Sequence, residues 1–264
     1  CSFCAIPLMR GQHVSKSMDD LVKEAEGLVK KGVKEVMLIA QELTYYGLDI
    51  YKKRMLGDLM NRLADVKGLE WIRLHYAYPS KFPLEVLDVM RERDNICNYL
   101  DMPLQHAANK MLKAMKRQIT REEMEELTIA IREKVPGICL RTTLIAGFPG
   151  ETEDDVEELK GFLQRQRFDR VGIFTYSHEE GTSAHDLVDD VPAEVKESRA
   201  QEIMEVQQEI SLELNQEKVG KVFKTLIDKK EAGRYLGRTE FDSVEVDNEV
   251  VIQSAKKLPI GEFV

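Results

Sequence analysis

GICLRTTLIAGF, residues 137–148, is an apolar run of strand type that stops at Pro149 and Gly150. Thr152 and Asp155 follow with the spacing of a capping box, which predicts a helix from there to about residue 165. The next strand-type run is RVGIFTY at 170–176. A strand, a helix and a second strand in this order predict a parallel βαβ unit with a right-handed crossover.

The same alternation fills most of the chain. Further strands are expected at 33–40, 71–78 and 99–104, and helices at 18–31, 55–66, 83–92, 108–116 and 121–134. A long, charge-rich helix is expected from 192 to about 219. After it, short runs separated by Gly, Asp and Asn indicate a small antiparallel β unit, with strands at 222–227, 234–239, 244–246 and 250–252. The sequence therefore predicts an α/β fold with five parallel strands, and a domain boundary near residue 218.

Composition excludes several classes of protein. Of the 264 residues, 43% are hydrophobic and 32% are charged, which is typical of a globular protein rather than a disordered one. No apolar run approaches the ~20 residues of a membrane span, and no targeting segment is visible, so we expect a cytoplasmic protein. The net charge of −9 argues against direct nucleic acid binding and favours a basic partner.

Cys1-Ser2-Phe3-Cys4 is a C-x-x-C motif, whose two thiolates can reach one metal centre. On the tetrapeptide alone, a redox pair, half of a zinc site or a chance pairing remain open. No second C-x-x-C or histidine pair follows, which counts against zinc. Pro7 and Gly11 are expected to keep the next stretch irregular, which counts against a thioredoxin-type motif. Cys97 and Cys139 are expected to be small buried hydrophobic residues.

Six segments read together carry a resemblance to a known family. CSFCAIPLMRG, IAQELTYYG, HYAYP, YLDMPLQH, LIAGFPGET and YSHEEGTSAH stand in this order at the ends of expected strands. They resemble the successive motifs of the radical S-adenosylmethionine (SAM) methylthiotransferases. The resemblance covers nearly all of 1–218, and 219–264 resembles an incomplete TRAM domain, a small OB-like β barrel.

Within that family, IAQELTYYG, HYAYP and DMPLQH are most similar to the branch that adds a methylthio group to the β-carbon of an aspartate in small-subunit ribosomal protein S twelve. A methylthiotransferase acting on a transfer RNA adenosine shares the SAM-site motifs and is the first alternative. The second, from another class, is a cluster-free module that docks on the ribosome.

The resemblance implies a partial TIM-like barrel and a 4Fe-4S cluster. The family motif is C-x-x-x-C-x-x-C, in which Cys1 and Cys4 match the second and third cysteines. The first would lie four residues before Cys1, so we expect this chain alone to hold the cluster poorly. The resemblance also implies two clusters in the complete enzyme, SAM as a cofactor and a protein electron donor.

Positions that match the family's SAM contacts follow from the same resemblance. Gln41 and Glu42 fall where the methionine amino group is bound, and Phe3 falls against the adenine or the cluster. Gln105 is a candidate for ribose contacts. For each of these residues, simple loop packing or hydrogen bonding is the alternative.

Arg141 and Thr143 alternate with their neighbours on the expected strand, so both should point to one face. An arginine inside a parallel barrel needs a partner. The SAM carboxylate and a structural ion pair are equally plausible, and the sequence leaves this choice open.

Four further residues are candidates for substrate contact. His75 and His106 lie in strand-end loops, although each could be an ordinary polar loop residue. Glu179 and Glu180 begin an acidic loop that continues to Asp190. Such a loop could steer a lysine- and arginine-rich ribosomal protein toward the barrel, or it could simply be a solvated surface.

Overall fold

The computed structural model describes all residues from 1 to 264, and its centre is a five-stranded parallel sheet. The strands lie side by side in chain order: β1 (Glu35–Leu38), β2 (Trp71–Leu74), β3 (Ile96–Asp101), β4 (Cys139–Ala146) and β5 (Arg170–Thr175). This arrangement confirms the expected fold class.

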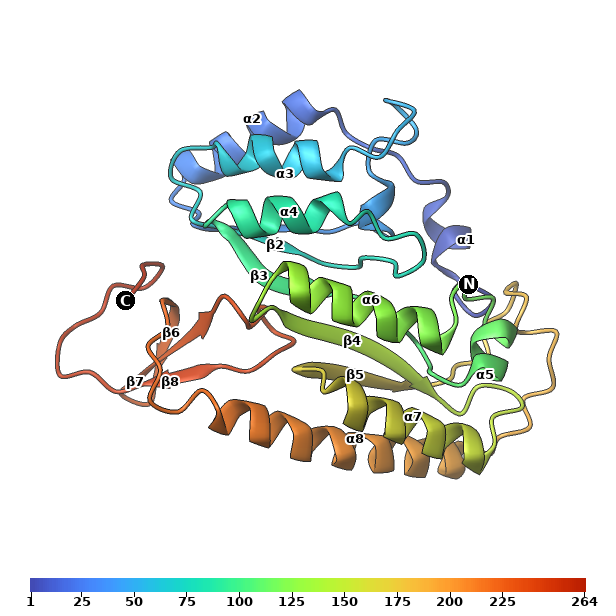
Figure 1. The fold of residues 1–264 in the computed structure, drawn as a ribbon. Coiled ribbons are helices and arrows are strands. Elements are labelled where there is room, and N and C mark those ends of the chain that lie inside the picture. Colours follow the sequence, from blue (N-terminus) through green and yellow to red (C-terminus); the bar gives the residue numbers. More distant parts are fainter.

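Helices connect and cover the strands (Figure 1). Their bounds are α1 (Ile6–Arg10), α2 (Met18–Lys30), η1 (Leu43–Tyr45), α3 (Leu56–Ala64), α4 (Glu85–Glu92), α5 (Asn109–Ala114), α6 (Arg121–Lys134), α7 (Glu153–Gln166) and α8 (Ala193–Gln216). The main core lies between these helices and the sheet. Leu100 and Leu144 from the strands are fully buried there, as are Leu87 and Phe162 from α4 and α7. Burying each such side chain contributes about 1.5–3 kcal/mol to folding.

Helix starts follow the local sequence. The Ser17 hydroxyl accepts a hydrogen bond from the Asp20 amide at 3.2 Å where α2 begins. At α7, the amide of Thr152 donates to the Asp155 carboxylate at 2.8 Å, as the capping-box spacing predicts. These contacts satisfy amides that have no partner within the helix.

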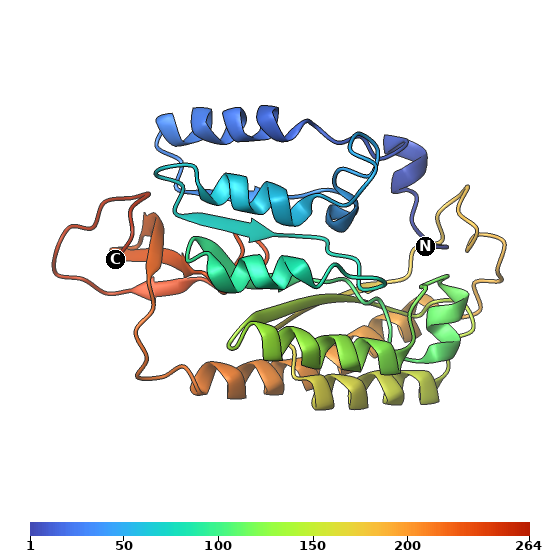
Figure 2. The same ribbon diagram turned by 45° about the horizontal axis from the view of Figure 1, so that its top comes forward.

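A second, three-stranded antiparallel sheet follows α8. It consists of β6 (Thr225–Glu231), β7 (Arg234–Thr239) and β8 (Val250–Ile252). It lies at the amino ends of the parallel strands, whereas the N-terminus lies at their carboxyl ends (Figures 1 and 2).

Residues 239–247 leave this second sheet and pack against the parallel strands. The Asp242 carboxylate pairs with Arg170 at 2.8 Å, and the Asp247 carboxylate accepts from the Tyr99 hydroxyl at 2.7 Å. Arg73 donates to the carbonyl of Glu240 at 2.6 Å. Buried polar side chains of the large sheet, Arg73, Tyr99 and Arg170, therefore form hydrogen bonds or ion pairs with residues 240–247.

Three sequence expectations were wrong in detail. Residues 6–10 form α1 because a proline is tolerated in the first turn of a helix, and Gly11 ends it at a φ of +74°. The third strand ends at Asp101 rather than 104, since Pro103 cannot donate a ladder hydrogen bond. Residues 244–246 form a turn, which the amide of Ser243 closes by donating to Asp247 at 2.9 Å.

Two expectations about single residues are confirmed. Cys97 and Cys139 are buried on β3 and β4, and burial raises the pKa of Cys97 to about 12. Both thiols therefore behave as apolar core groups. No helix is both long and apolar enough to cross a membrane.

Candidate active site

The carboxyl ends of three neighbouring strands are followed by residues with left-handed backbone. These are Tyr76 with a φ of 58°, Gln105 with 80° and Gly147 with 76°. For residues other than glycine this conformation costs about 1–2 kcal/mol. At Gln105 two backbone hydrogen bonds hold it, because its amide donates to Thr143 and its carbonyl accepts from Ile145, both at 2.8 Å. The strand-end loops are thus fixed across one end of the sheet.

The cysteine loop is anchored at this same end. Ser2 is buried, its amide donates to the Met115 carbonyl at 2.9 Å, and its hydroxyl donates to the Ala114 carbonyl at 3.0 Å. Its carbonyl accepts from the Ala184 amide at 2.8 Å. Cys1 is exposed, Cys4 is half-buried, and both are free thiols. The loop therefore sits between the end of α5 and the segment that follows β5.

Arg117 connects the cysteine loop to the loops after β1 and β2. Its Nη1 donates to Cys1 Sγ at 2.9 Å, and its guanidinium lies 4.3 Å from the centre of the Tyr78 ring. The Tyr78 amide in turn donates to Glu42 at 3.2 Å. The sequence reasoning missed Arg117, because nothing in the local sequence places it beside a cysteine more than a hundred residues away.

Glu42 is held in place by its own loop. Its Oε1 accepts from the amide and the hydroxyl of Thr44, at 2.8 and 2.6 Å, as well as from Tyr78. Burial raises the pKa of this carboxyl, although these hydrogen bonds oppose the shift. Gln41 beside it is exposed. The expected role of both residues at the SAM amino group stays a prediction.

Arg141 and Thr143 point to one face of β4, as expected, since Arg141 Nη1 lies 3.4 Å from the Thr143 hydroxyl. Arg141 also pairs with Asp101 at 2.9 Å and with Asp247 at 3.4 Å. Burial lowers its pKa, but these carboxylates outweigh burial, so the net pKa is raised. The structure therefore contains the ion-pair arrangement, and a contact to the SAM carboxylate stays a prediction.

Phe3 packs beside an apolar cluster at the carboxyl ends of β4 and β5. Its ring meets Phe148 edge-on with centroids 6.5 Å apart, and Phe148 meets Tyr176 at 5.1 Å. This contact fixes the ring between the two cysteines. Its expected place against adenine or a cluster stays a prediction.

His106 was a candidate for substrate contact, with an ordinary polar loop residue as the alternative. Its side chain is fully buried, which favours the alternative. Its Nδ1 accepts from the amides of Ala107 and Ala108, both at 2.9 Å, and its Nε2 lies 3.3 Å from Glu151. These contacts make His106 a structural residue that ties the loop after β3 to the start of α7.

His75 is also largely buried, between two parts of the chain. Its Nε2 lies 2.9 Å from the Ser243 hydroxyl, and its Nδ1 lies 3.5 Å from the Asp101 carboxylate. Its partners are thus a strand of the large sheet and the C-terminal residues. A contact with substrate stays a prediction.

Glu179 and Glu180 are exposed in the loop after β5. This loop lies next to the cysteine loop, because the Ala184 amide, four residues beyond Glu180, donates to the Ser2 carbonyl at 2.8 Å. Part of its negative charge is neutralised within the chain, since Asp189 pairs with Lys196 at 2.8 Å. The contact of Glu179 and Glu180 with a substrate stays a prediction.

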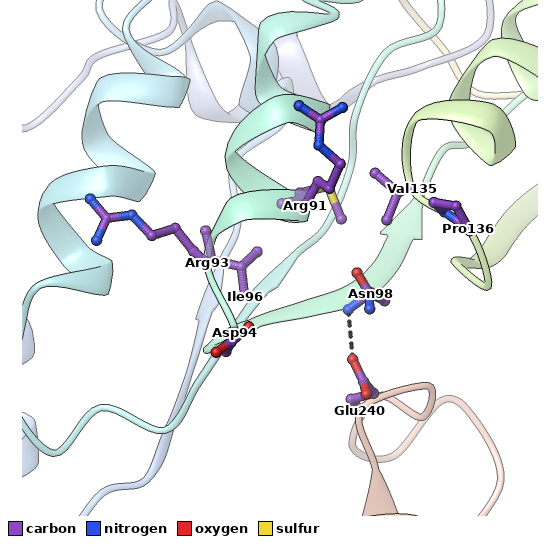
Figure 3. Close-up of a pocket in the computed structure, with 9 residues that line it drawn as sticks. Arg91, Arg93, Asp94, Ile96, Asn98, Val135, Pro136 and Glu240 are labelled. Carbon is purple, nitrogen blue, oxygen red and sulfur yellow. Dashed lines mark hydrogen bonds between the residues drawn. The ribbon is translucent and has the colours of Figure 1, made fainter.

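The surface pocket in Figure 3 lies at the other end of the sheet. It has a volume of about 360 Å³ and is lined by Ile96 and Asn98 of β3, by Pro136 before β4 and by Glu240. The Asn98 amide donates to Glu240 at 3.0 Å. Because strand-end loops and cysteines gather at the carboxyl ends, this pocket is separate from the candidate site.

The residues of the candidate site fit a partial ligand set for iron. No group of three or more His, Cys, Asp or Glu side chains in the chain could hold a metal ion. Cys1 and Cys4 supply two thiols, the ligand type that iron–sulfur clusters require. Next to them, Arg117 Nε is buried without a hydrogen-bond partner. Two thiols beside an unsatisfied cationic group match part of an anionic cluster site.

Family comparisons agree with this arrangement. Residues 1–163 match the radical SAM superfamily, and residues 219–264 match the TRAM domain. The chain is 59% identical over 265 residues to a Flavobacterium psychrophilum protein named ribosomal protein uS12 methylthiotransferase RimO. It is 60% identical over 264 residues to a protein of the same name from Cytophaga hutchinsonii. Both matches cover 100% of the chain, but only 61% and 60% of the relatives.

Solved structures show the same fold at lower identity. Coproporphyrinogen III oxidase from Escherichia coli, a radical SAM enzyme, superposes with a TM-score of 0.56 at 20% identity, over 80% of this chain and 50% of the other. Methylornithine synthase superposes with a TM-score of 0.55 at 16% identity, over 78% and 58%. At this identity the likeness concerns the fold alone.

Proposed function

The chain belongs to the radical SAM superfamily, and we propose that it is the SAM- and cluster-binding core of a methylthiotransferase that modifies an aspartate of small-subunit ribosomal protein S twelve. The observation that carries this proposal is the 59% identity, along the whole chain, to a relative named ribosomal protein uS12 methylthiotransferase RimO. The chain spans about three fifths of the length of such relatives. The activity is therefore proposed for the whole protein.

The superfamily uses a 4Fe-4S cluster and SAM, which together supply one-electron chemistry that breaks a carbon–sulfur bond of SAM. In this chain, Cys1 and Cys4 would bind iron. Ser2 fixes the loop between them through three hydrogen bonds. Phe3 and Phe148 would keep water from the apolar side of the site.

Among the proposed SAM contacts, the positions of Glu42 and Gln105 support a contact with SAM better than the position of Arg141 does. Glu42 is linked to Cys1 through Tyr78 and Arg117, and Gln105 stands at the carboxyl end of the sheet. Arg141 is the third residue of β4 and lies toward the opposite end. We infer that its two carboxylate partners account for most of its role.

For the substrate, we propose a basic protein rather than a nucleic acid. The chain carries a net charge of −9, and the acidic loop with Glu179 and Glu180 lies beside the cysteine loop. Opposite charges would steer a lysine- and arginine-rich protein toward the site, and salt would weaken this attraction.

A fusion protein provides the test of activity. The chain is placed behind the upstream part of the Cytophaga hutchinsonii relative, reconstituted without oxygen, and offered both ribosomal protein S twelve and transfer RNA. We expect mass spectrometry to find one methylthio group on an aspartate of the protein and none on the RNA. Cys1→Ala and Cys4→Ala should abolish the reaction. Modification of the RNA alone would move the protein to the alternative branch.

Cluster content is a separate prediction. The chain by itself supplies two cysteine ligands at the site, whereas the fusion protein should supply three. We expect iron and sulfide assays to find a stoichiometric four-iron cluster at this site in the fusion and little in the chain alone. A stable four-iron cluster on the chain alone would contradict the ligand assignment.

A further inference from the structure

Arg117 differs from every other buried arginine of the chain. Five arginines are buried, and four of them form salt bridges with carboxylates: Arg73 with Glu35, Arg170 with Asp242, Arg199 with Glu151, and Arg238 with Glu35 and Asp228. Arg117 is only 7% exposed, and its hydrogen-bond partners are a thiol and the Pro103 carbonyl. Its Nε has no partner, as is also the case for Arg170 and Arg199, so the missing carboxylate is what sets Arg117 apart.

A buried cation without a counter-ion is costly for a protein. The Arg117 guanidinium lies 4.3 Å from the centre of the Tyr78 ring, but no carboxylate forms a salt bridge with it. An unpaired buried charge is strongly unfavourable unless an opposite charge lies beside it. An anionic group bound at the adjacent cysteine loop would supply the missing opposite charge.

The position of Arg117 relative to the cysteines is fixed by the backbone. Lys116, just before it, has a φ of 55°, and the Arg117 amide donates to the Leu112 carbonyl at 2.8 Å. The adjacent residue Met115 accepts from the Ser2 amide. One turn of chain thus carries both the guanidinium and the anchor of the cysteine loop.

We propose that Arg117 is a fixed positive charge that donates to the sulfur of Cys1 when this cysteine binds an iron–sulfur cluster, and that it raises the reduction potential of that cluster. This inference rests on the proposed function. Adding one electron makes a cluster one unit more negative, so a nearby guanidinium and an N–H···S hydrogen bond stabilise the reduced form more than the oxidised form. Arg117 is a positioning residue, because it acts through Cys1.

The test is a potentiometric titration of the fusion protein, with titanium(III) as the one-electron reductant and electron paramagnetic resonance as the readout. The relative's upstream part is expected to bind a second cluster. Its cysteines outside the C-x-x-x-C-x-x-C motif are therefore replaced by alanine, so that only the signal of the cluster at Cys1 and Cys4 remains. Arg117→Gln removes the charge and keeps an amide donor. We expect at least a tenfold loss in the reduction equilibrium, a shift of about 59 mV to lower potential for a one-electron couple.

Two variants serve as controls. Lys116→Gln removes a positive charge one residue away, but this side chain is exposed and contacts Ser183 rather than a cysteine. Its shift should be less than a third of that of Arg117→Gln, because solvent screens it. Arg117→Lys keeps the charge and should stay closer to the parent protein than Arg117→Gln does.

The outcomes separate this inference from the proposed function. If the parent fusion holds no cluster, the proposed function fails and the inference with it. If the parent holds a cluster and Arg117→Gln leaves its potential unchanged, only the inference fails. If both Arg117 variants lose the cluster and melt at equally lower temperatures, Arg117 has a purely structural role and the inference is overturned.

Discussion

Single charged residues inside this protein find partners from distant parts of the chain. Arg141 on β4 pairs with Asp101 at the end of β3 and with Asp247 from the C-terminal residues. Both carboxylates are almost fully buried, at 1% side-chain exposure. Removing Arg141 would therefore leave two buried carboxylates without this cation.

Replacing Arg141 by Gln should destabilise the fold. Losing one partner of a buried ion pair costs about 3–5 kcal/mol, since the remaining charges stay buried. Urea unfolding of the chain measures this loss. Arg91→Gln is a matched control, because Arg91 pairs with exposed partners and should change stability by less than about 1 kcal/mol. Unchanged stability together with a tenfold weaker affinity of the fusion protein for SAM would instead assign Arg141 to the cofactor.

Asp101 should make stability depend on pH. Burial raises its pKa, but hydrogen bonds with His75 and Arg141 outweigh burial, so the net pKa is lowered. Because the folded pKa is depressed, the stabilisation is present above the unfolded value of about 3.9 and is lost as pH falls through the folded value.

The stability gap between the parent chain and Asp101→Asn should therefore be widest near neutral pH and should close below about pH 4. Urea unfolding between pH 3 and pH 7 measures the gap. Asp94→Asn is the control, since Asp94 is exposed and forms no salt bridge, and its gap should stay flat. A gap for Asp101→Asn that does not change with pH would contradict the role of the carboxylate.

How far the sequence predicts single residues depends on how local their environment is. Ser17 and Thr152 were predicted correctly, because a helix cap depends on the next three residues. Arg117 and the partners of Arg141 were not predictable, since these contacts join residues that lie 40 to 116 positions apart in the sequence. The burial of His106 was not predictable either, because a loop motif does not reveal which of its side chains point into the protein.

At the scale of elements, the carboxyl end of β4 packs very closely against the start of α8. Gly147 directly follows β4; its φ is +76°, and an added Cβ there would lie 2.1 Å from Lys196 Cγ in α8. Lys196 is buried, pairs with Asp189 at 2.8 Å and lies over the Tyr176 ring. The end of β4 and the start of α8 therefore fit only without a side chain at residue 147.

Gly147→Ala should destabilise the chain by about 2–5 kcal/mol, combining about 1–2 for left-handed backbone with about 1–3 for overpacking. Gly137→Ala is a matched control, with a φ of +80° and nothing within 4 Å of the added atom. It should cost only the backbone part. Urea unfolding compares the two, and equal losses would show that Lys196 moves aside freely.

The bounds of strands were predictable where turn-forming residues flank them, and less predictable elsewhere. The strands at 234–239 and 250–252 match the sequence expectation, because glycine, aspartate and asparagine delimit them. The third parallel strand was expected three residues late, since Asn98 interrupts its apolar run and only the part after Asn98 was recognised as strand. Residues 244–246 look like a strand by composition, but their neighbours bind the large sheet instead.

At the scale of the whole molecule, the segment between β7 and β8 supplies the large sheet with buried polar partners. Asp242, Ser243 and Asp247 meet Arg170, His75 and Tyr99, and two backbone carbonyls meet Arg73. The sequence predicted a boundary near residue 218, which stays a prediction. We propose that 1–218 and 219–264 are distinct in fold but unfold as one unit.

Ending the chain at Lys218 tests this coupling. Without residues 219–264, Arg170 and Tyr99 lose their carboxylate partners, and the inner surface of the sheet gains polar groups without hydrogen bonds. Each such group costs about 1–3 kcal/mol, more when it is charged. We therefore expect the shortened chain to melt at a clearly lower temperature and over a broader range, as followed by circular dichroism.

Asp242→Asn is the point variant that isolates the contact. It removes the carboxylate that pairs with Arg170 and accepts from the Thr239 hydroxyl, and keeps the shape of the side chain. Asp228→Asn is its control within the same sheet, because Asp228 is partly exposed and its partner Arg238 keeps Glu35. Asp242→Asn should lower the melting temperature more than Asp228→Asn does, and both should keep a single transition. Two separate transitions in the parent chain, with the first 218 residues melting unchanged after truncation, would show two independent domains.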